Sequence, residues 1–259
     1  MSNRTIRFIR LYPIMLWLCC SLVTHGQADS AVKVPVEDGN GFKFSGNIGL
    51  NTNGISRVPA FSLGKPAIMG FFSLRKNRFS FDPEVAYSTE GNPWFMNSCF
   101  RYRIYAKKNF DVMVSANWSI SHRYTEVIEN GLKTIAKAER YVVFEFVPTY
   151  KLSEKFSLGS AVFVGRGIDK GSLKQMHFIS LVGNITKLRL SEKLYYSFFP
   201  QIFYLNLDGD TDSLFVSGVA GIGHKRFPFF LSSQINQPVV TAISPNPGFS
   251  WNIGVTYTF

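Results

Sequence analysis

The sequence predicts an all-β protein: a single transmembrane antiparallel up-and-down β-barrel of about 12 strands that follows a cleaved signal peptide. Three observations lead to this prediction. An export signal begins the chain, amphipathic segments of about ten residues recur along the rest of it, and the connections between these segments alternate between short and long. Short turns at one end and longer loops at the other are typical of bacterial outer-membrane barrels.

The first residues have the three parts of a secretory signal peptide. Three arginines precede an apolar run at residues 11–23, and Gly26 and Ala28 are small residues of the kind that signal peptidase reads. The run is too short for a helix that spans a bilayer, which argues against an uncleaved anchor. We expect cleavage near Ala28, so residues 1–28 form the signal peptide, 29–41 a short polar leader and 42–259 one outer-membrane barrel domain.

Composition narrows the class of protein further. After cleavage one cysteine, Cys99, remains, so the fold has no intramolecular disulfide. The chain has 28 basic and 17 acidic residues; the signal peptide holds three arginines and no acid, which leaves a net charge of +8. The basic residues are scattered along the sequence and the protein is exported, so we expect no nucleic-acid partner. No segment beyond the signal approaches eighteen consecutive apolar residues, which excludes a helical membrane protein.

The strands are predicted from alternation with a period of two residues. Most of the segments have ten or more residues, which at ~3.3 Å per residue and ~45° tilt span roughly 24 Å, the height of an outer-membrane apolar band. The strands of a soluble β-sandwich, which is the alternative fold, are usually shorter. The predicted strands are residues 42–52, 67–75, 78–88, 97–107, 110–123, 139–151, 156–166, 176–188, 193–205, 214–224, 227–236 and 249–259.

The connections predict the orientation of the barrel. Tight polar turns such as Lys76-Asn77 and Lys225-Arg226 alternate with longer segments, and twelve strands put both ends of the domain on the short-turn side, the periplasm. The longest loop before the sixth strand, residues 124–138, carries charges of both signs; it could include a short helix and fold over the mouth of the barrel. The other predicted long loops are residues 53–66, 89–96, 167–175, 206–213 and 237–248.

Each strand has one apolar face and one polar face. In the last strand Phe249, Ile253 and Val255 share the odd-numbered face with the aromatic residues of the predicted insertion signal, whereas the even-numbered residues are small or polar. A membrane barrel turns the apolar face to lipid. Four prolines inside predicted strands count against this reading, because proline removes a ladder donor, and we expect bends or bulges there. These prolines are Pro83, Pro148, Pro200 and Pro228, and the insertion signal consists of Trp251, Tyr257 and Phe259.

The inward faces predict a lumen with charges of both signs. Asp82 and Glu84 on the third strand lie beside Arg101 and Arg103 on the fourth. The four charges either neutralise one another and fill a narrow barrel, because an unpaired buried charge is costly, or form a constriction that selects solutes by charge. Neutralisation is favoured because a twelve-strand barrel is narrower than a sixteen-strand porin. The predicted lumen lining also includes Lys43, Glu145, Asn47, Asn117, Asn184, Gln201 and Gln234.

Catalytic and metal motifs are weak. The histidines beyond the signal, His122, His177 and His224, do not stand in the histidine–any residue–serine arrangement of a known twelve-strand outer-membrane phospholipase, and Ser121 points away from His122 on a strand. We therefore interpret these histidines as residues of the membrane interface. Residues 208–212 look superficially like a calcium loop but lack its glutamate and its helices, so an exposed acidic loop is expected. We therefore predict no catalytic residues, no metal and no cofactor.

One part of the chain carries a family resemblance. Residues 49–55, 59–66 and 79–84, with Gly91-Asn92-Pro93-Trp94 and the strand Arg101-Tyr102-Arg103, make residues 45–105 resemble a group of uncharacterised outer-membrane barrel proteins of Bacteroidetes-type bacteria. The resemblance implies an outer-membrane location and a barrel fold. It transfers no functional residues.

These observations predict an integral outer-membrane protein that acts as a narrow pore for solute passage or as a structural barrel. The alternatives are a lipid-modifying enzyme, of the phospholipase or lipid A deacylase type, and a receptor or secretion-complex component that acts through its loops. The expected partners are outer-membrane lipid and lipopolysaccharide, together with the barrel-assembly machinery, which recognises a C-terminal strand of this kind.

Overall fold

The computed structural model describes residues 41–128 and 132–259. The predicted signal peptide, and all but the last residue of the predicted leader, lie outside the described residues. Twelve strands and one short 3-10 helix make up the described chain. Their bounds are β1 (Lys43–Asn51), η1 (Pro59–Phe61), β2 (Ala67–Lys76), β3 (Phe79–Ser88), β4 (Pro93–Ala106), β5 (Phe110–Ile128), β6 (Leu132–Lys151), β7 (Phe156–Gly167), β8 (Met176–Arg189), β9 (Leu194–Leu207), β10 (Thr211–His224), β11 (Phe229–Thr241) and β12 (Ser250–Thr258).

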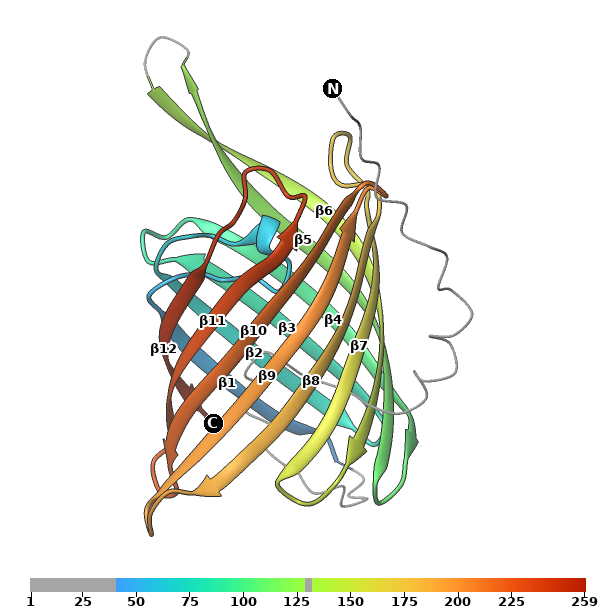
Figure 1. Cartoon of the computed structure of the whole chain (residues 1–259), viewed down its shortest axis with the longest axis vertical. Helices are drawn as coiled ribbons and strands as arrows, with labels where there is room; N and C mark the ends of the chain where they lie inside the picture. Colours follow the sequence, from blue (N-terminus) through green and yellow to red (C-terminus); the bar gives the residue numbers. More distant parts are fainter. Residues whose placement is uncertain (1–40, 129–131) are drawn as a thin grey trace, which may run out of the picture.

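The strands form one closed antiparallel barrel in which each strand pairs with its neighbours in the chain and β1 pairs with β12 (Figure 1). The predicted fold class is therefore confirmed. Closure satisfies the backbone hydrogen bonds of every strand without leaving a free edge, which the hydrocarbon core of a membrane requires. No helix in the described part of the chain is long and apolar enough to cross a membrane.

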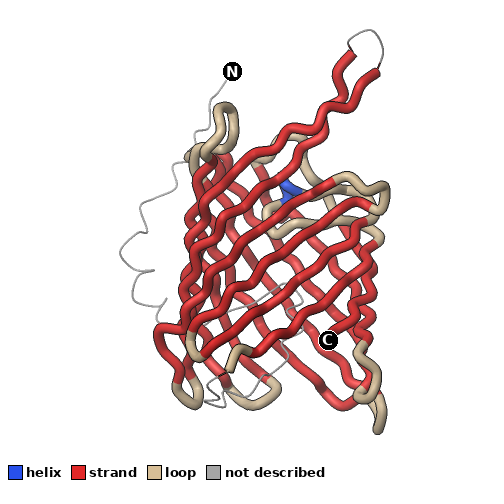
Figure 2. Tube along the Cα trace, turned by 180° about the vertical axis from the view of Figure 1, so that it is seen from behind, coloured by secondary structure: helices blue, strands red, loops and turns tan. Residues whose placement is uncertain are grey.

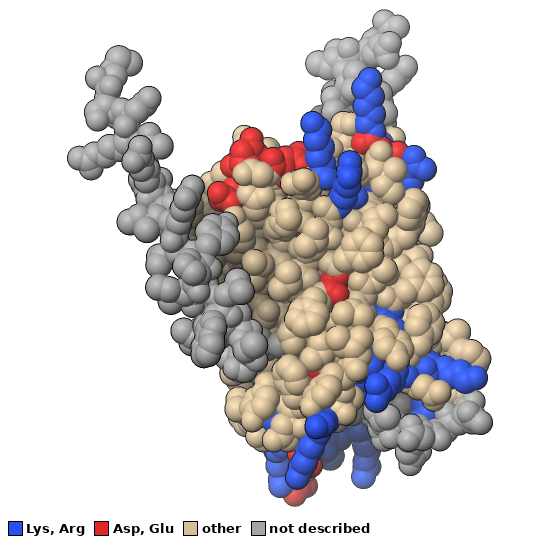
Figure 3. All heavy atoms as spheres, turned by 90° about the vertical axis from the view of Figure 1, so that its right-hand side faces the viewer, with Lys and Arg blue, Asp and Glu red and all other residues tan. Residues whose placement is uncertain are grey.

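An apolar belt surrounds the barrel between two charged ends. The outward residues of the strands are mostly large, apolar and exposed, and lysine, arginine, aspartate and glutamate gather mainly above and below them (Figure 3). A belt of this kind is stable only against lipid. Members of the belt on different strands include Trp118, Phe144, Phe146, Ile179, Leu181, Ile202, Val216, Trp251, Ile253 and Val255.

The five short turns of the barrel form a basic collar at one end. Each turn has two to four residues, and each contributes two exposed basic side chains within it or at its borders. The sequence analysis described the basic residues as scattered; folding gathers ten of them in one ring because alternate connections meet at the same end of a barrel. The collar consists of Lys76, Arg78, Lys107, Lys108, Lys151, Lys155, Arg189, Lys193, Lys225 and Arg226, beside which lie the acidic residues Glu154 and Glu192.

The prediction for residues 124–138 is wrong. β5 continues to Ile128 and β6 begins at Leu132, so no helix forms in the described part of this segment and the hairpin projects away from the barrel instead of covering it (Figures 1 and 2). Two other predicted loops are shorter than expected for the same reason: paired strands continue past the belt, leaving connections of residues 89–92 and 208–210. β11 likewise extends to Thr241.

The four prolines of the predicted strands do not produce the expected bulges. The strand registers are unchanged on either side of Pro83, Pro148 and Pro200, and Pro228 precedes β11. The extra residue of one irregularity is instead Trp94, because Ala86 pairs with Phe95 and Tyr87 with Pro93. A bulge re-aims a side chain, and the Trp94 side chain is buried, with 2% exposed.

The seam between β1 and β12 includes the terminal aromatic residue. The backbone N–H and carbonyl of Phe259 both bond to Gly46, at 2.9 Å each. Its ring lies 6.1 Å from that of Phe44 and 6.4 Å from that of Phe72, centroid to centroid. A Cβ atom at Gly46 would lie 2.9 Å from the Phe259 ring, so a larger residue there would require this ring to move.

Candidate functional site in the barrel interior

The register of strands β4 to β8 brings the side chains of the candidate site together. Arg101 pairs with Ser115, Ser115 with Glu145, Glu145 with Phe163, and Phe163 with Phe178. Directly paired residues of adjacent strands share a face, so these five side chains form one row across the inner wall from β4 to β8. Charged groups therefore meet aromatic groups in the middle of the row, at Glu145 and Phe163.

Three of the four predicted charged residues of β3 and β4 are in contact. Arg101 donates to Asp82 at 2.7 Å and lies 3.5 Å from Glu84. The hydroxyl groups of Ser73 and Ser80 donate to the two carboxylate oxygens of Asp82 at 2.5 and 2.9 Å. The Asp82 carboxylate is therefore compensated by one guanidinium and two hydroxyl groups, as a buried charge requires.

The other two basic residues of the predicted cluster lie apart from this contact. Arg103 pairs with Asp111 at 3.0 Å, a partner that the sequence analysis did not propose. Lys43 begins β1 at the short-turn end and pairs in register with Arg75. The predicted cluster is therefore divided into an Asp82–Glu84–Arg101 group, an Arg103–Asp111 pair, Glu145 and Lys43.

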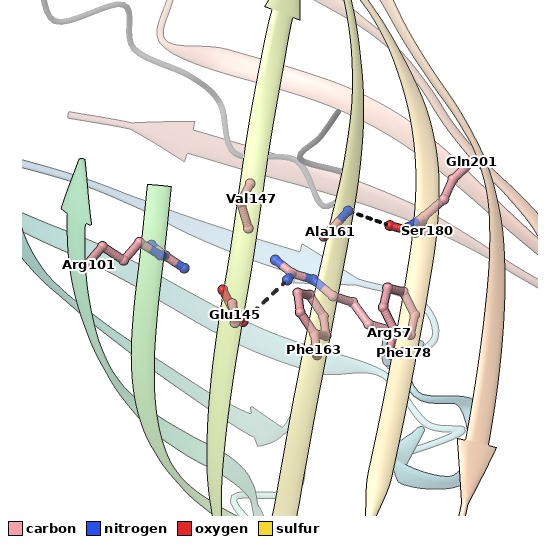
Figure 4. A pocket seen from close by; sticks show the side chains of 9 residues that line it. All are labelled: Arg57, Arg101, Glu145, Val147, Ala161, Phe163, Phe178, Ser180 and Gln201. Carbon is pink, nitrogen blue, oxygen red and sulfur yellow. Dashed lines mark hydrogen bonds and ion pairs between the residues drawn. The ribbon is translucent and has the colours of Figure 1, made fainter. Parts of the chain in front are cut away.

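The connection between β1 and β2 enters the barrel, which the sequence analysis did not predict. We name residues 52–66 the inner loop. Its Arg57 reaches the Glu145 carboxylate at 4.0 Å, and its guanidinium carbon lies 5.5 Å from the centre of the Phe163 ring. In Figure 4 the Arg57 side chain extends between Glu145 and the two phenylalanines of the row. Since Glu145 is in the middle of the spanning part of β6, the loop descends well below the barrel mouth.

Several contacts anchor the inner loop. The indole N–H of Trp94 donates to the carbonyl of Phe61 at 2.7 Å. The Phe61 ring lies edge-on to Tyr141 at 5.3 Å and under the Arg123 guanidinium at 5.2 Å. Val58 is buried in the interior apolar cluster. The sequence signal for this placement was the row of apolar residues in a loop that would otherwise be exposed: Ile55, Val58, Phe61 and Leu63.

An aromatic ladder covers the wall opposite the ion pairs. Phe163, Phe178, Phe203 and Phe215 come from β7 to β10, and successive ring centroids are 4.7, 5.1 and 4.9 Å apart. All four side chains are buried. The period-two analysis treated this inner face as polar and missed the ladder, although adjacent apolar pairs such as Phe178-Ile179 and Phe203-Tyr204 indicate strands that are apolar on both faces.

Three of the remaining predicted lumen residues, Asn47, Gln201 and Gln234, line two small cavities. One, of about 20 Å³, is lined by four residues of the row, Arg101, Glu145, Phe163 and Phe178, together with Arg57 and Gln201 (Figure 4). The other, of about 60 Å³, is lined by Asn47, Gln234 and Asn252 together with part of the inner loop. Asn117 and Asn184 are buried but line neither cavity. Each cavity has room for water but not for a larger solute while the inner loop is in place.

Groups with possible catalytic or metal-binding chemistry are dispersed. Ser121 is buried inside the barrel and His122 follows it on the outer face, and in the described chain neither His122 nor His177 forms a hydrogen bond with a serine. The Asp208 carboxylate accepts the backbone N–H groups of Lys174 and Gln175. No group of three or more potential metal ligands occurs among the described residues.

Outside the belt, a further ion pair, between Arg140 and Asp169, holds the β7–β8 loop. Asp169 accepts hydrogen bonds from the Arg140 guanidinium and, at 2.7 Å, from its backbone N–H. The side-chain bonds first, and then the backbone bond, hold the pKa of the Asp169 carboxyl below its ordinary value.

Comparison with known proteins identifies the fold. No protein-family model matches the chain, and no curated protein matches it. Among solved structures, it is similar to the KdgM porin, with a TM-score of 0.53 and 8% identity over 83% of this chain and 99% of that chain. A structure of the KdgM porin in complex with disordered oligogalacturonate has a TM-score of 0.51, with the same identity and coverage. An outer-membrane channel from Pseudomonas putida F1 has a TM-score of 0.49 and 10% identity over 83% of this chain and 95% of that chain. With its closed barrel and apolar belt, the chain is an outer-membrane β-barrel protein.

Proposed function

We propose that this barrel is a narrow, gated passage for small solutes, in which the inner loop occupies the lumen and must move before a solute passes. The observation that carries the proposal is the contact of Arg57 with Glu145 in the middle of the barrel. A barrel that served only as a structural wall would not need an ion pair between a strand and a loop inside its lumen. The KdgM porin, which has the same fold, is consistent with passage.

The charged lumen residues are the proposed constriction. Asp82, Glu84 and Arg101 project from one wall, and Glu145 and Arg57 narrow the remaining space. Charged side chains facing each other across a narrow pore select solutes by charge. The position of Arg57 inside the lumen, beside Glu145, supports a low conductance in the resting state.

Planar-bilayer conductance of the refolded protein tests the proposal. We expect rare, small openings for the wild type and a larger, more frequent conductance when residues 55–64 are replaced by a two-residue turn. A matched control trims residues 126–134 from the β5–β6 hairpin, outside the lumen, and should leave the conductance unchanged. Absence of any channel after removal of the inner loop, and also after Arg101→Ala plus Arg103→Ala, would refute passage.

We further infer that the role is not enzymatic, since Ser121 and His122 are consecutive residues of β5 and therefore lie on opposite faces of the strand. The alternative, turnover of phospholipid or lipid A near the outer leaflet, is tested by incubating the purified protein with each lipid. Activity that disappears in His122→Ala or His177→Ala would overturn our inference.

We infer that the barrel-assembly machinery recognises the last strand of the protein through Trp251, Tyr257 and Phe259. A separate inference is that the protein belongs to the Bacteroidetes-type group that residues 45–105 resemble. Exposure of all three aromatic side chains on the lipid face supports the first inference. This recognition is tested by crosslinking the Phe259→Ala variant and the wild type to the machinery during insertion. Unchanged crosslinking of the variant would contradict a recognition signal at this residue. Lipopolysaccharide and phospholipid are the expected surroundings of the belt.

A further inference from the structure

We propose that Glu145 and Phe163 form a binding site for a small organic cation, and that Arg57 occupies this site in the closed barrel in place of that ligand. The inference rests on the proposed passage function and adds the chemical class of the solute: an ammonium or guanidinium group on an apolar body. Arg57 then acts as an internal competitor that the solute displaces.

The site has the two groups that bind a desolvated cation. The Glu145 side chain is only 8% exposed; one of its oxygens accepts the Ser115 hydroxyl at 2.9 Å and the other lies 4.0 Å from Arg57. The Phe163 ring offers its face to the same guanidinium, at 5.5 Å. A buried carboxylate requires a counter-charge, and an aromatic face attracts cations through its quadrupole.

Charge in the lumen favours a cation once the inner loop leaves. Arg57 belongs to the loop, whereas the carboxylates of Asp82, Glu84 and Glu145 belong to the strands and stay in place. Arg101 contributes one positive charge against these three and is engaged with Asp82 and Glu84. Displacement of the loop therefore leaves a net negative lumen at the level of Glu145, which attracts positively charged solutes.

The surroundings of the site fit an apolar body behind the charged group. Val147, Ala161 and Phe178 line the adjoining cavity, and the aromatic ladder continues from Phe178 to Phe203 and Phe215. Gln201 and Ser180 supply the polar atoms of the lining. The cavity of about 20 Å³ does not hold such a solute together with the Arg57 side chain, so binding and displacement of the loop are coupled.

Titration calorimetry of the full-length refolded protein with benzylammonium tests the site without requiring a channel. Arg57→Ala vacates the site and should bind benzylammonium at least tenfold more tightly than the wild type. Glu145→Gln in the Arg57→Ala background should abolish binding, and Phe163→Leu should weaken it about fivefold. Phenylacetate and benzyl alcohol, which have the same ring with a negative or no charge, should not bind.

Control variants distinguish binding at this site from a general effect of lumen charge or of misfolding on the benzylammonium affinity. Arg103→Ala removes another lumen arginine, paired with Asp111, and should leave the affinity unchanged. Arg57→Gln, which keeps hydrogen-bond donors but loses the charge, replaces Arg57→Ala if that variant does not fold. Equal affinity of wild type and both Arg57 variants, or equal binding of phenylacetate, would refute the proposal.

Conductance distinguishes failure of the site from failure of the passage function. Under a salt gradient, the reversal potential of the variant lacking residues 55–64 should show preference for cations. Anion preference in that variant would refute the cation site while leaving a pore. Tight benzylammonium binding without any conductance would refute passage while leaving the site.

Discussion

Arg101 is the residue on which the buried charge of β3 depends. Its guanidinium contacts both Asp82 and Glu84, whose side chains are only 7% and 13% exposed. The alternation of β3 and β4 was enough to predict that these residues face inward, since a side chain's face follows from a period of two. The pairing of Arg103 with Asp111 was not predictable, because it depends on the register between β4 and β5.

Removing Arg101 should destabilise the barrel strongly. Arg101→Met leaves the Asp82 carboxylate buried without a counter-charge, which costs about 3–5 kcal/mol. Urea unfolding from vesicles, followed by tryptophan fluorescence, measures the change in the free energy of unfolding. The double variant Asp82→Asn plus Arg101→Met should recover much of the loss, and an Arg101→Met barrel as stable as the wild type would contradict this account.

Asp169 should make the β7–β8 loop sensitive to acid. Because its pKa is lower in the folded protein than in the unfolded chain, the stabilisation from Arg140 is complete above the unfolded value of roughly 4 and is lost as the pH falls through the folded value. Amide exchange of residues 168–175, corrected for intrinsic rates, should be constant from pH 8 to 5 and rise only under stronger acid. Asp169→Asn should exchange faster at pH 7; an equal rate would exclude this role for the ion pair.

The inner loop and the β5–β6 hairpin illustrate the limits of reading elements from sequence. Strand existence was predictable because twelve alternating segments must place one face on lipid. The lengths of the strands were not predictable. β5 and β6 remain paired beyond the apolar belt, where the outward residues no longer face lipid and need not be apolar. The position of residues 52–66 inside the barrel depends on Trp94. The indole of Trp94 reaches the Phe61 carbonyl because a bulge in β4 turns this side chain inward.

Trimming the β5–β6 hairpin should leave the barrel intact. β5 pairs with β4 no farther than Ser121, and β6 pairs with β7 no farther than Tyr141, so the described residues of the segment 126–134 pair only with each other. Replacing residues 126–134 by a two-residue turn should therefore preserve folding, as judged by the heat-dependent shift in electrophoretic mobility. Loss of that shift would show that the hairpin is needed for the barrel to form.

At the scale of the whole molecule, charge is distributed unequally between the two ends. The basic collar at the short turns contains ten lysines and arginines and adjoins two acidic residues. Acidic and basic groups are mixed at the opposite end, as in the pairs Lys65–Glu90 and Arg140–Asp169. The excess positive charge of the chain therefore faces the predicted periplasmic surface of the membrane.

The collar should make insertion depend on anionic lipid. Each basic residue near an anionic membrane surface contributes about 1 kcal/mol, an attraction that salt screens. Refolding into vesicles should therefore be faster with phosphatidylglycerol than with phosphatidylcholine alone, and the difference should disappear at high salt. Changing Lys107, Lys108, Lys225 and Arg226 to glutamine should reduce it, whereas Lys65→Gln plus Lys170→Gln at the other end should not. Equal effects at both ends would argue against the collar.

The pairing of β1 with β12 also fixes when the barrel can close during synthesis of the chain. Every other strand pair joins neighbours in sequence, whereas Thr52 and Asn252, which are 200 residues apart, meet across this one. β1 therefore emerges first and must wait, with its edge unpaired, until β12 has been synthesised. An exposed strand edge invites pairing with other chains. The interval between the first strand and the last is thus the period of greatest risk for this protein, and a factor that covers the edge of β1 would protect it for that time.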